Sequence, residues 1–264
     1  MVPGLAGCDG GSAASQKVIV TGSTTLMPIA EVAAEEYQDQ HPETDVLVSG
    51  MGSSAGIESV SNGSSDIGTS SRELKDEELD LGLVDTPVAY DAIAVIVHPD
   101  NPVRELTTIQ VRSIYAGVVT NWSELGGPDL EIGLVNRDEA SGTREAFKKI
   151  VMDDADFDRG AVVLPGTGQV RSVVADVPGA IGYISLGFVN DDVRAVAVDD
   201  VEPSEAAVIA GTYPIQRTLH FFTLGDAEGA TADYIAYVLS PAVQDTIVRD
   251  AGFIPITARE APGD

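Results

Sequence analysis

Three short loops of this chain are rich in hydroxyl side chains, and each lies where a predicted strand gives way to a helix. They contain Thr24-Thr25, Ser53-Ser54 and Ser141-Gly142-Thr143. A helix N-terminus leaves backbone N–H groups unpaired and carries about half a positive charge, so it can hold a small anion without any lysine. The pattern therefore predicts an oxyanion site, although each loop taken alone also fits an ordinary helix cap.

Two arginines lie close to hydroxyl groups in the sequence. Arg72 directly follows Ser70-Ser71, and Arg137 precedes Ser141 by four residues. A guanidinium presents paired, permanently charged N–H donors that match an oxyanion. Each arginine alone also fits a surface ion pair in so acidic a chain, but its position next to a hydroxyl loop favours the anion site.

Strand and helix patterns alternate along the chain and would bring these loops together. We expect strands near 18–20, 46–48, 66–68, 88–97, 130–135, 180–184 and 219–224. We expect helices that end near 37 and 61, and helices over 108–115, 142–151, 169–175, 233–239 and 241–249. The carboxyl ends of parallel strands share one sheet edge, so loops distant in sequence converge there. The strand at 88–97 is long enough to leave one domain for another.

Acidic residues dominate the charge of the chain. Its 264 residues include 42 Asp and Glu against 15 Lys and Arg, a net charge of −27. The length allows one large domain or two ordinary ones. A nucleic-acid partner is not expected, because phosphates need a basic face. Only four of the basic residues are lysines, so we interpret the composition as halophilic, with an ordinary acidic protein as the alternative.

The single cysteine, Cys8, excludes an intramolecular disulfide and any metal site built from several cysteines. It follows Leu5-Ala6-Gly7 and precedes a polar Gly/Ser stretch, an order that resembles the lipobox of exported lipoproteins. We expect Cys8 to carry a lipid and residues 1–16 to form a flexible tether. No apolar run reaches 18 residues, so no transmembrane helix is expected.

Seven segments carry a family resemblance when their order and spacing are taken together. They are 22–25 (GSTT), 52–56 (GSSAG), 66–72 (DIGTSSR), 87–91 (PVAYD), 120–122 (TNW), 137–144 (RDEASGTR) and 179–183 (GAIGY). From about residue 17 to 256, the chain resembles the phosphate-binding lipoproteins of phosphate ABC importers. These PstS-like proteins are a branch of the type II periplasmic binding proteins, and we expect this one to be of halophilic archaeal character.

The resemblance implies an α/β fold of two lobes, with mixed sheets covered by helices and a ligand cleft between the lobes. The first lobe would hold residues 17–92 and 205–264, and the second lobe residues 93–204. The implied function is capture of inorganic phosphate outside the cell, with an ABC transporter permease as partner. The protein would be a monomer held at the outer face of the membrane by its lipid alone, with no cofactor and no enzymatic activity.

The resemblance also places the phosphate contacts. They fall on Thr24, Thr25, Ser53, Ser71, Arg72, Arg137, Ser141, Gly142 and Thr143. Two positions depart from the family pattern: Ala140 stands where glycine is common, and Ser71 stands where some relatives have an aspartate. The second departure removes a carboxylate from the expected site.

That carboxylate matters because hydrogenphosphate has a proton to donate, whereas sulfate at neutral pH has none. An ionised acceptor would leave two like charges facing each other in a sulfate complex, at a cost of several kcal/mol. We expect Asp91, in the crossing strand, to replace the missing aspartate. Asp66 is the runner-up, although it also fits a strand-end cap.

Other functions fit parts of the same pattern. A binder of sulfate, molybdate or tungstate would use the same donors, and a sensor lobe without a transport partner could share the fold. A phosphate-ester hydrolase would need a base beside Ser141, yet the three histidines, His41, His98 and His220, are isolated in the sequence. We therefore expect no catalytic residue and no metal site.

Overall fold

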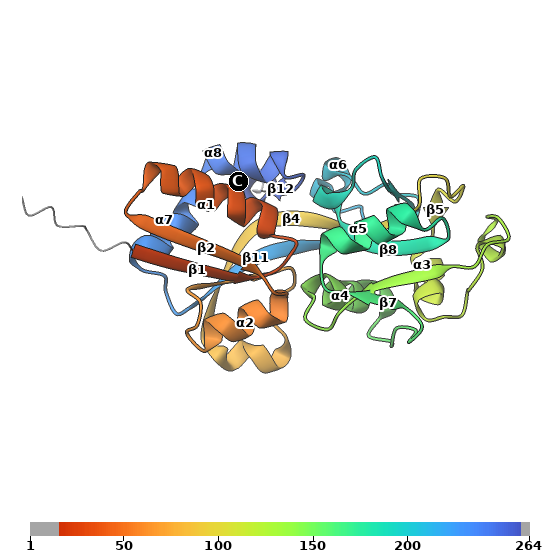
Figure 1. Ribbon diagram of the computed structural model, residues 1–264, viewed down its shortest axis with the longest axis horizontal. Helices are drawn as coiled ribbons and strands as arrows, with labels where there is room; N and C mark the ends of the chain where they lie inside the picture. Colours follow the sequence, from red (N-terminus) through yellow and green to blue (C-terminus); the bar gives the residue numbers. More distant parts are fainter. Residues whose placement is uncertain (1–15, 260–264) are drawn as a thin grey trace, which may run out of the picture.

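The computed structural model describes residues 16–259, which form two lobes joined by a pair of long strands (Figure 1). The expected lipid attachment at Cys8 lies outside the described residues and stays a prediction. Within the described residues, no helix is both long and apolar enough to span a membrane.

The first lobe is built on three parallel strands. Strand β1 (Gln16–Gly22) lies between β2 (Thr44–Gly50) and β3 (Ile67–Ser70) and pairs with both. Figure 1 shows α1 on one side of β1 and β2 and α2 on the other. The helices of this lobe are α1 (Met27–Gln40), α2 (Ser53–Ser61), α7 (Gly229–Val238) and α8 (Pro241–Val243), which continues as the π-helical turn Gln244–Val248.

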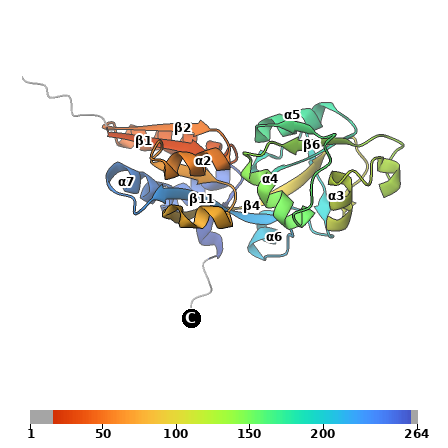
Figure 2. The same ribbon diagram turned by 90° about the horizontal axis from the view of Figure 1, so that it is seen from below.

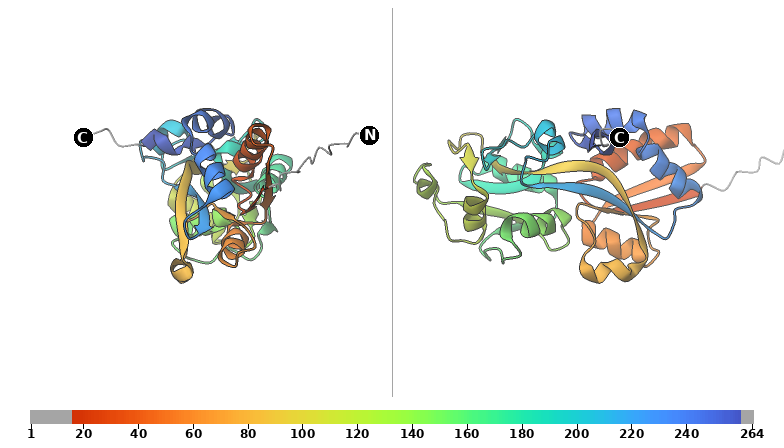
Figure 3. Two further views of the ribbon diagram at one scale, coloured as in Figure 1. Left: turned by 90° about the vertical axis from the view of Figure 1, so that its left-hand side faces the viewer. Right: turned by 180° about the vertical axis from the view of Figure 1, so that it is seen from behind.

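Two antiparallel strands cross between the lobes, as the right-hand view of Figure 3 shows. They are β4 (Leu83–Val97) and β11 (Gln216–Leu224), and their register places Arg217 opposite Asp91. They join the strands of both lobes into one mixed sheet. On from β4, this sheet continues through β8 (Ala180–Ser185), β6 (Gly133–Arg137) and β7 (Val162–Leu164), so that its order is β2-β1-β3-β11-β4-β8-β6-β7. The short strands β9 (Arg194–Ala195) and β12 (Ile254–Pro255) also pair with β4.

The second lobe contributes β8, β6 and β7 to this sheet. Its helices are α3 (Thr108–Tyr115), α4 (Gly142–Phe147), which continues as the π-helical turn Lys148–Met152, α5 (Thr167–Asp176) and α6 (Glu205–Ile209). Strands β5 (Glu105–Leu106) and β10 (Ala197–Val198) form a separate small sheet.

Strand β4 is buried on both faces in the second lobe, and its side chains alternate between two cores. Ile93, Val95 and Val97 pack in the core with α3 and α4, whereas Ala94 and Ile96 pack in the core with α5. Successive side chains of a strand point to opposite faces, so a continuous apolar run is what helices on both faces require. The sheet is therefore packed between two helical layers.

The expected α/β fold with helix-covered mixed sheets is confirmed, and every expected strand and helix is present. The expected helices at 142–151 and 241–249 pass from α-helix into π-helix along their length. The lobe boundaries stay a prediction. In the structure, Val208, Tyr213 and Ile215 belong to the second-lobe core, so we place the return to the first lobe within β11.

Candidate functional site

The polar loops of the two lobes meet where α2 and α4 approach each other (Figure 2). The Oγ1 atoms of Thr25 and Thr143 are 3.2 Å apart, as are those of Thr24 and Thr167. We call the group of side chains gathered here the hydroxyl cluster. Its members are Thr24, Thr25, Ser53, Ser71, Ser141, Thr143 and Thr167.

Two glycines let the backbones of the lobes touch at this cluster. A Cβ on Gly142 would collide with the Ser53 side chain across the interface. Gly52 has a φ of +95°, and a Cβ there would lie 2.7 Å from the Ala140 carbonyl oxygen. Glycine is therefore required at both positions, and the Ser54 amide can donate to Ala140 O at 3.1 Å.

Four helices begin at the hydroxyl cluster: α1, α2, α4 and α5. The first turn of a helix carries backbone N–H groups without partners inside the helix and the positive end of the helix dipole, so four such ends lie close to the cluster. Ser141 is the N-cap of α4, because its Oγ accepts from the Arg144 amide at 3.2 Å. The ordinary capping role and a place in the site are thus combined in one residue.

Hydrogen bonds within the cluster orient its hydroxyl protons. Ser53 Oγ accepts from the Ser71 amide at 2.9 Å, and Thr167 Oγ1 accepts from Arg137 Nη1 at 3.1 Å. A hydroxyl whose oxygen already accepts an N–H keeps its own proton to donate. The cluster can therefore present several O–H donors to an anion, while Ser71 Oγ contacts Ser23 Oγ at its edge.

Arg137 is buried at the end of β6 with only 2% of its surface exposed. Its guanidinium donates to four neutral oxygens: Leu164 O, Pro165 O at 2.7 Å, and the hydroxyls of Thr24 and Thr167. Burial lowers the pKa of Arg137, but an arginine is protonated at any physiological pH. The nearby Asp138 carboxylate acts against that shift, but among the described residues it forms no ion pair with Arg137. A buried cation without such a partner is costly, so this site favours an anion.

A second buried arginine, Arg217, lies at the same site on β11. Its Nη1 donates to Thr143 Oγ1 at 2.9 Å and to the Ser71 carbonyl at 3.1 Å. Its Nε and Nη2 both donate to Asp91 Oδ2, at 2.9 and 2.7 Å. The two lobes are thus linked through one guanidinium.

Asp91, expected to accept a phosphate proton, is fully buried beside Arg217. Its Oδ1 accepts from the Ser185 hydroxyl at 2.7 Å and the Leu186 amide at 3.3 Å, in addition to the two bonds that Oδ2 accepts from Arg217. Burial raises the pKa of Asp91, and Arg217 works against that shift. Direct proton acceptance by Asp91 stays a prediction, and this geometry disfavours it.

The other expected charged groups are engaged elsewhere. Arg72 is buried and donates to both carboxylate oxygens of Glu78, at 2.6 and 2.8 Å, and to Ser54 Oγ at 3.3 Å. An ion pair was the alternative interpretation of Arg72, but this pair is largely buried and does not lie on the surface. The runner-up acceptor, Asp66, receives the Ile19 amide at 2.7 Å, which agrees with a strand-end cap.

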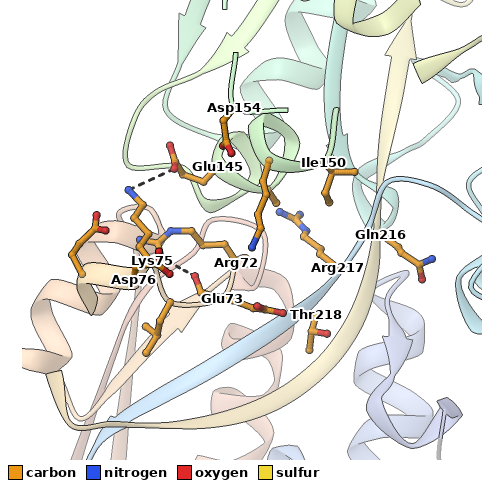
Figure 4. Close-up of a pocket in the computed structure, with 14 residues that line it drawn as sticks. Arg72, Glu73, Lys75, Asp76, Glu145, Ile150, Asp154, Gln216, Arg217 and Thr218 are labelled. Carbon is orange, nitrogen blue, oxygen red and sulfur yellow. Dashed lines mark hydrogen bonds and ion pairs between the residues drawn. The ribbon is translucent and has the colours of Figure 1, made fainter. Parts of the chain in front are cut away.

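A groove of about 470 Å³ runs between the lobes beside the hydroxyl cluster (Figure 4). Residues of both lobes and of β11 line it, including Arg72, Lys149 and Arg217. At its edge, Lys75 of the first lobe forms an ion pair with Glu145 of α4 at 3.5 Å. The lobes are therefore joined both inside the site and at its rim.

The sequence patterns missed Thr167 and Arg217. Thr167 follows β7 in the same strand–loop–helix arrangement as the other hydroxyls, but the three-residue strand gives too short an apolar run to be noticed. Arg217 lies inside a strand and carries no loop motif. Its acidic partner is 126 residues away in sequence, so only the pairing of β4 with β11 brings the two together.

Comparisons with known proteins agree with this geometry. Residues 9–242 match the model of the PBP superfamily domain. The chain is 36% identical over 254 residues to the phosphate-binding protein PstS of Bacillus subtilis, covering 95% of this chain and 84% of that one. It is also similar to a phosphate ABC transporter substrate-binding protein from Clostridium perfringens, solved with bound phosphate, at a TM-score of 0.87 and 38% identity over 91% of this chain and all of that one.

A third similar protein is an ABC-type phosphate transport receptor from Vibrio cholerae. Its structure aligns with a TM-score of 0.77 and 32% identity, again over 91% of this chain and 100% of the other. Each of these matches extends across both lobes and the strands that cross between them.

Proposed function

Because this chain belongs to the PBP superfamily and, within it, to the family of PstS phosphate-binding proteins, we propose that it captures inorganic phosphate for an ABC importer. Phosphate would lie between the lobes and would be enclosed when they close around it. The closed form is then the one that the permease recognises.

One observation carries this proposal: Arg137 is a buried cation whose donors reach only neutral oxygens, at a point where four helices begin. Fixed charges and donors in a desolvated site favour a compact, multiply charged oxyanion. We propose that the hydroxyl cluster, the Gly142 backbone and Arg137 contact the ligand directly. Arg72 would act from the rim through Ser54, and Asp91 through Arg217.

The family is one of transport binding proteins rather than enzymes. A serine hydrolase needs a base beside its nucleophile, and the three histidines are the candidate bases in this chain. His41 lies 3.5 Å from Glu43 and His98 lies 3.9 Å from Asp100. His220 lies 2.7 Å from Asp85. None of these contacts includes a member of the hydroxyl cluster.

Calorimetric titration of the ligand-free protein in high salt tests the proposed function. Phosphate should bind more tightly than sulfate, arsenate or molybdate, and an added phosphate ester should stay intact. Arg137→Ala should lose most of the phosphate affinity, whereas Arg112→Ala, which removes a partly exposed arginine on α3, should keep it. Tighter binding of sulfate or molybdate, or hydrolysis of the ester, would contradict the proposal.

The expected cellular setting belongs to the same proposal. We propose an extracellular monomer attached to the outer face of the membrane through a lipid on Cys8, and adapted to high salt. The lipobox-like order around Cys8 supports the anchor, and mass spectrometry of protein from native membranes would test it. Archaeal character stays a prediction supported by composition alone.

A further inference from the structure

Asp91 and Arg217 lie directly opposite each other on the two strands that connect the lobes. Both residues also form hydrogen bonds with residues outside the two crossing strands. Arg217 donates to Ser71 O of the first lobe and to Thr143 Oγ1 of the second, and Asp91 accepts from Ser185 of the second. The pair is therefore the point at which both lobes and both crossing strands share one hydrogen-bond network.

The carboxylate of Asp91 has no acceptor capacity to spare. Two carboxylate oxygens offer about four lone-pair positions, and Asp91 already accepts four hydrogen bonds, two from Arg217 and one each from Ser185 and Leu186. A proton donated by the ligand would have to displace one of them. The acceptor positions of the Asp91 carboxylate are therefore already filled by groups of the protein.

The bond from Arg217 to Thr143 determines what the Thr143 hydroxyl can do. Because its oxygen accepts from Nη1 at 2.9 Å, its own proton is available to donate. Thr143 is 2% exposed, and its Oγ1 lies 3.2 Å from Thr25 Oγ1 of the opposite lobe. The hydroxyl proton is therefore available at the interface between the lobes and not to bulk solvent. Arg217 Nη1 also donates to the Ser71 carbonyl oxygen at 3.1 Å, which fixes the position of the Ser71 peptide.

We propose that Arg217 is a positioning residue of the anion site, held in place by Asp91, and that it aligns the Thr143 hydroxyl and the Ser71 peptide for the ligand across the two lobes. This inference rests on the proposed function, since it assumes an oxyanion in the hydroxyl cluster. Asp91 then serves phosphate affinity through Arg217, and it does not set the preference for phosphate over sulfate.

A double-mutant cycle tests whether Arg217 acts through Thr143. Arg217→Lys keeps the charge but cannot hold Asp91, Ser71 and Thr143 together, and Thr143→Val removes the hydroxyl that Arg217 aligns. We expect each to weaken phosphate binding by about tenfold or more, and the double variant to be no more than about threefold weaker than the worse single variant. Losses that multiply to about a hundredfold would overturn the proposal. Arg112→Lys is the control for the lysine substitution and should bind as the parent does.

A charge-neutral pair separates positioning from folding, because Arg217→Gln alone would leave Asp91 buried and unpaired. In the Asp91→Asn/Arg217→Gln variant neither charge remains, so the ligand-free melting temperature should stay close to that of the parent. Phosphate affinity should still fall by about tenfold or more. Parent-like affinity in this variant would overturn the proposal.

The ratio of phosphate to sulfate affinity distinguishes positioning from proton acceptance. For Asp91→Asn we expect both affinities to fall together, with a ratio within about threefold of the parent value. A shift of about tenfold toward sulfate would identify Asp91 as the proton acceptor and overturn the inference. A parent that binds no phosphate would instead refute the proposed function, so the two failures are distinguishable.

Discussion

Of the three arginines that the described structure buries, Arg137 alone lacks a carboxylate partner. Glu78 neutralises Arg72 and Asp91 neutralises Arg217, at N–O distances of 2.6 and 2.7 Å. An uncompensated cation in a desolvated site raises the free energy of the empty closed form. An anion bound as we propose would remove that cost, so we expect Arg137 to contribute more to affinity than any other single residue.

Arg137→Ala should therefore weaken phosphate binding more than the loss of any one hydroxyl. We expect a loss of about 2 to 5 kcal/mol, against about 1 to 2 kcal/mol for Ser53→Ala, because a charged donor pair is removed from a buried site. Calorimetric titration of both variants at neutral pH measures the two losses. Equal losses, or a larger loss for Ser53→Ala, would show that Arg137 is not the principal charge.

Ser71 is the position at which a carboxylate can be introduced. Ser71→Asp should raise the ratio of phosphate to sulfate affinity by about tenfold or more, equivalent to about 1.4 kcal/mol, because an ionised acceptor can take the proton of hydrogenphosphate but repels sulfate. Ser71→Asn has nearly the same shape without the charge and should leave the ratio unchanged. If both variants shift the ratio equally, charge at this position does not control selectivity.

At the scale of elements, the loops were easier to predict than the connections between strands. Thr24, Ser53 and Thr143 lie where apolar runs end and helices begin, so local pattern alone places them at a sheet edge. The position of Arg217 in the site, and its hydrogen bonds to Asp91, depend on the register of two strands far apart in sequence. Local propensity carries no information about such pairing, and the structure was needed to find it.

The ion pair between Lys75 and Glu145 joins the loop after β3 to α4 at the rim of the groove. Lys75→Gln should speed phosphate release about 1.5- to 5-fold, because a partly exposed ion pair contributes about 0.2 to 1 kcal/mol. Stopped-flow measurements at the lowest salt that keeps the parent folded would detect the change. Lys148→Gln removes a pair with Asp156 inside the second lobe, at 3.9 Å, and should leave release unchanged. Identical release from the parent and Lys75→Gln would exclude a role in closure.

The pair of Arg72 with Glu78 fixes the loop after β3 against the 3-10 helix Asp76–Leu81. Burial opposes ionisation of Glu78, yet hydrogen bonds from Arg72 and the Lys75 amide lower its pKa below the ordinary value. A lowered pKa stabilises the fold above about pH 4.5, and that contribution is lost as pH falls through the folded-state value. Glu78→Gln should thus destabilise the protein by about 1 to 2 kcal/mol at pH 7.

Between pH 7 and pH 3 the difference in stability between the parent and Glu78→Gln should shrink as pH falls through the lowered folded-state pKa of Glu78, since the parent carboxyl then becomes protonated as well. Denaturant titrations of both proteins across this pH range provide the measurement. A difference between them that stays constant from pH 7 to pH 3 would show that the charge of Glu78 does not stabilise the loop. Glu77→Gln, one residue away and outside the pair, is the control.

At the scale of the whole molecule, acidic groups and buried charge are separated. In residues 16–259, Asp91 is the only carboxylate-bearing residue that is buried, and it is neutralised by Arg217. The remaining acidic residues of this part of the chain are partly or fully exposed, while all three buried arginines lie in or beside the site. The chain can therefore combine a net charge of −27 with a site that attracts an anion.

Because nearly all of the acidic residues in residues 16–259 are at least partly exposed, the dependence of the melting temperature on salt concentration tests halophilic adaptation. Screening alone is nearly complete at about 0.5 M potassium chloride, where the Debye length is about 4 Å, shorter than the spacing of most surface charges. A halophilic surface also holds hydrated cations among neighbouring carboxylates of the folded state, and mass action then continues to stabilise the fold as salt increases. We therefore expect the melting temperature of the phosphate-free protein to keep rising well beyond 0.5 M. Melting curves from about 0.1 to 3 M decide the matter, because an ordinary acidic protein, stabilised only by relief of repulsion, would reach a plateau near 0.5 M.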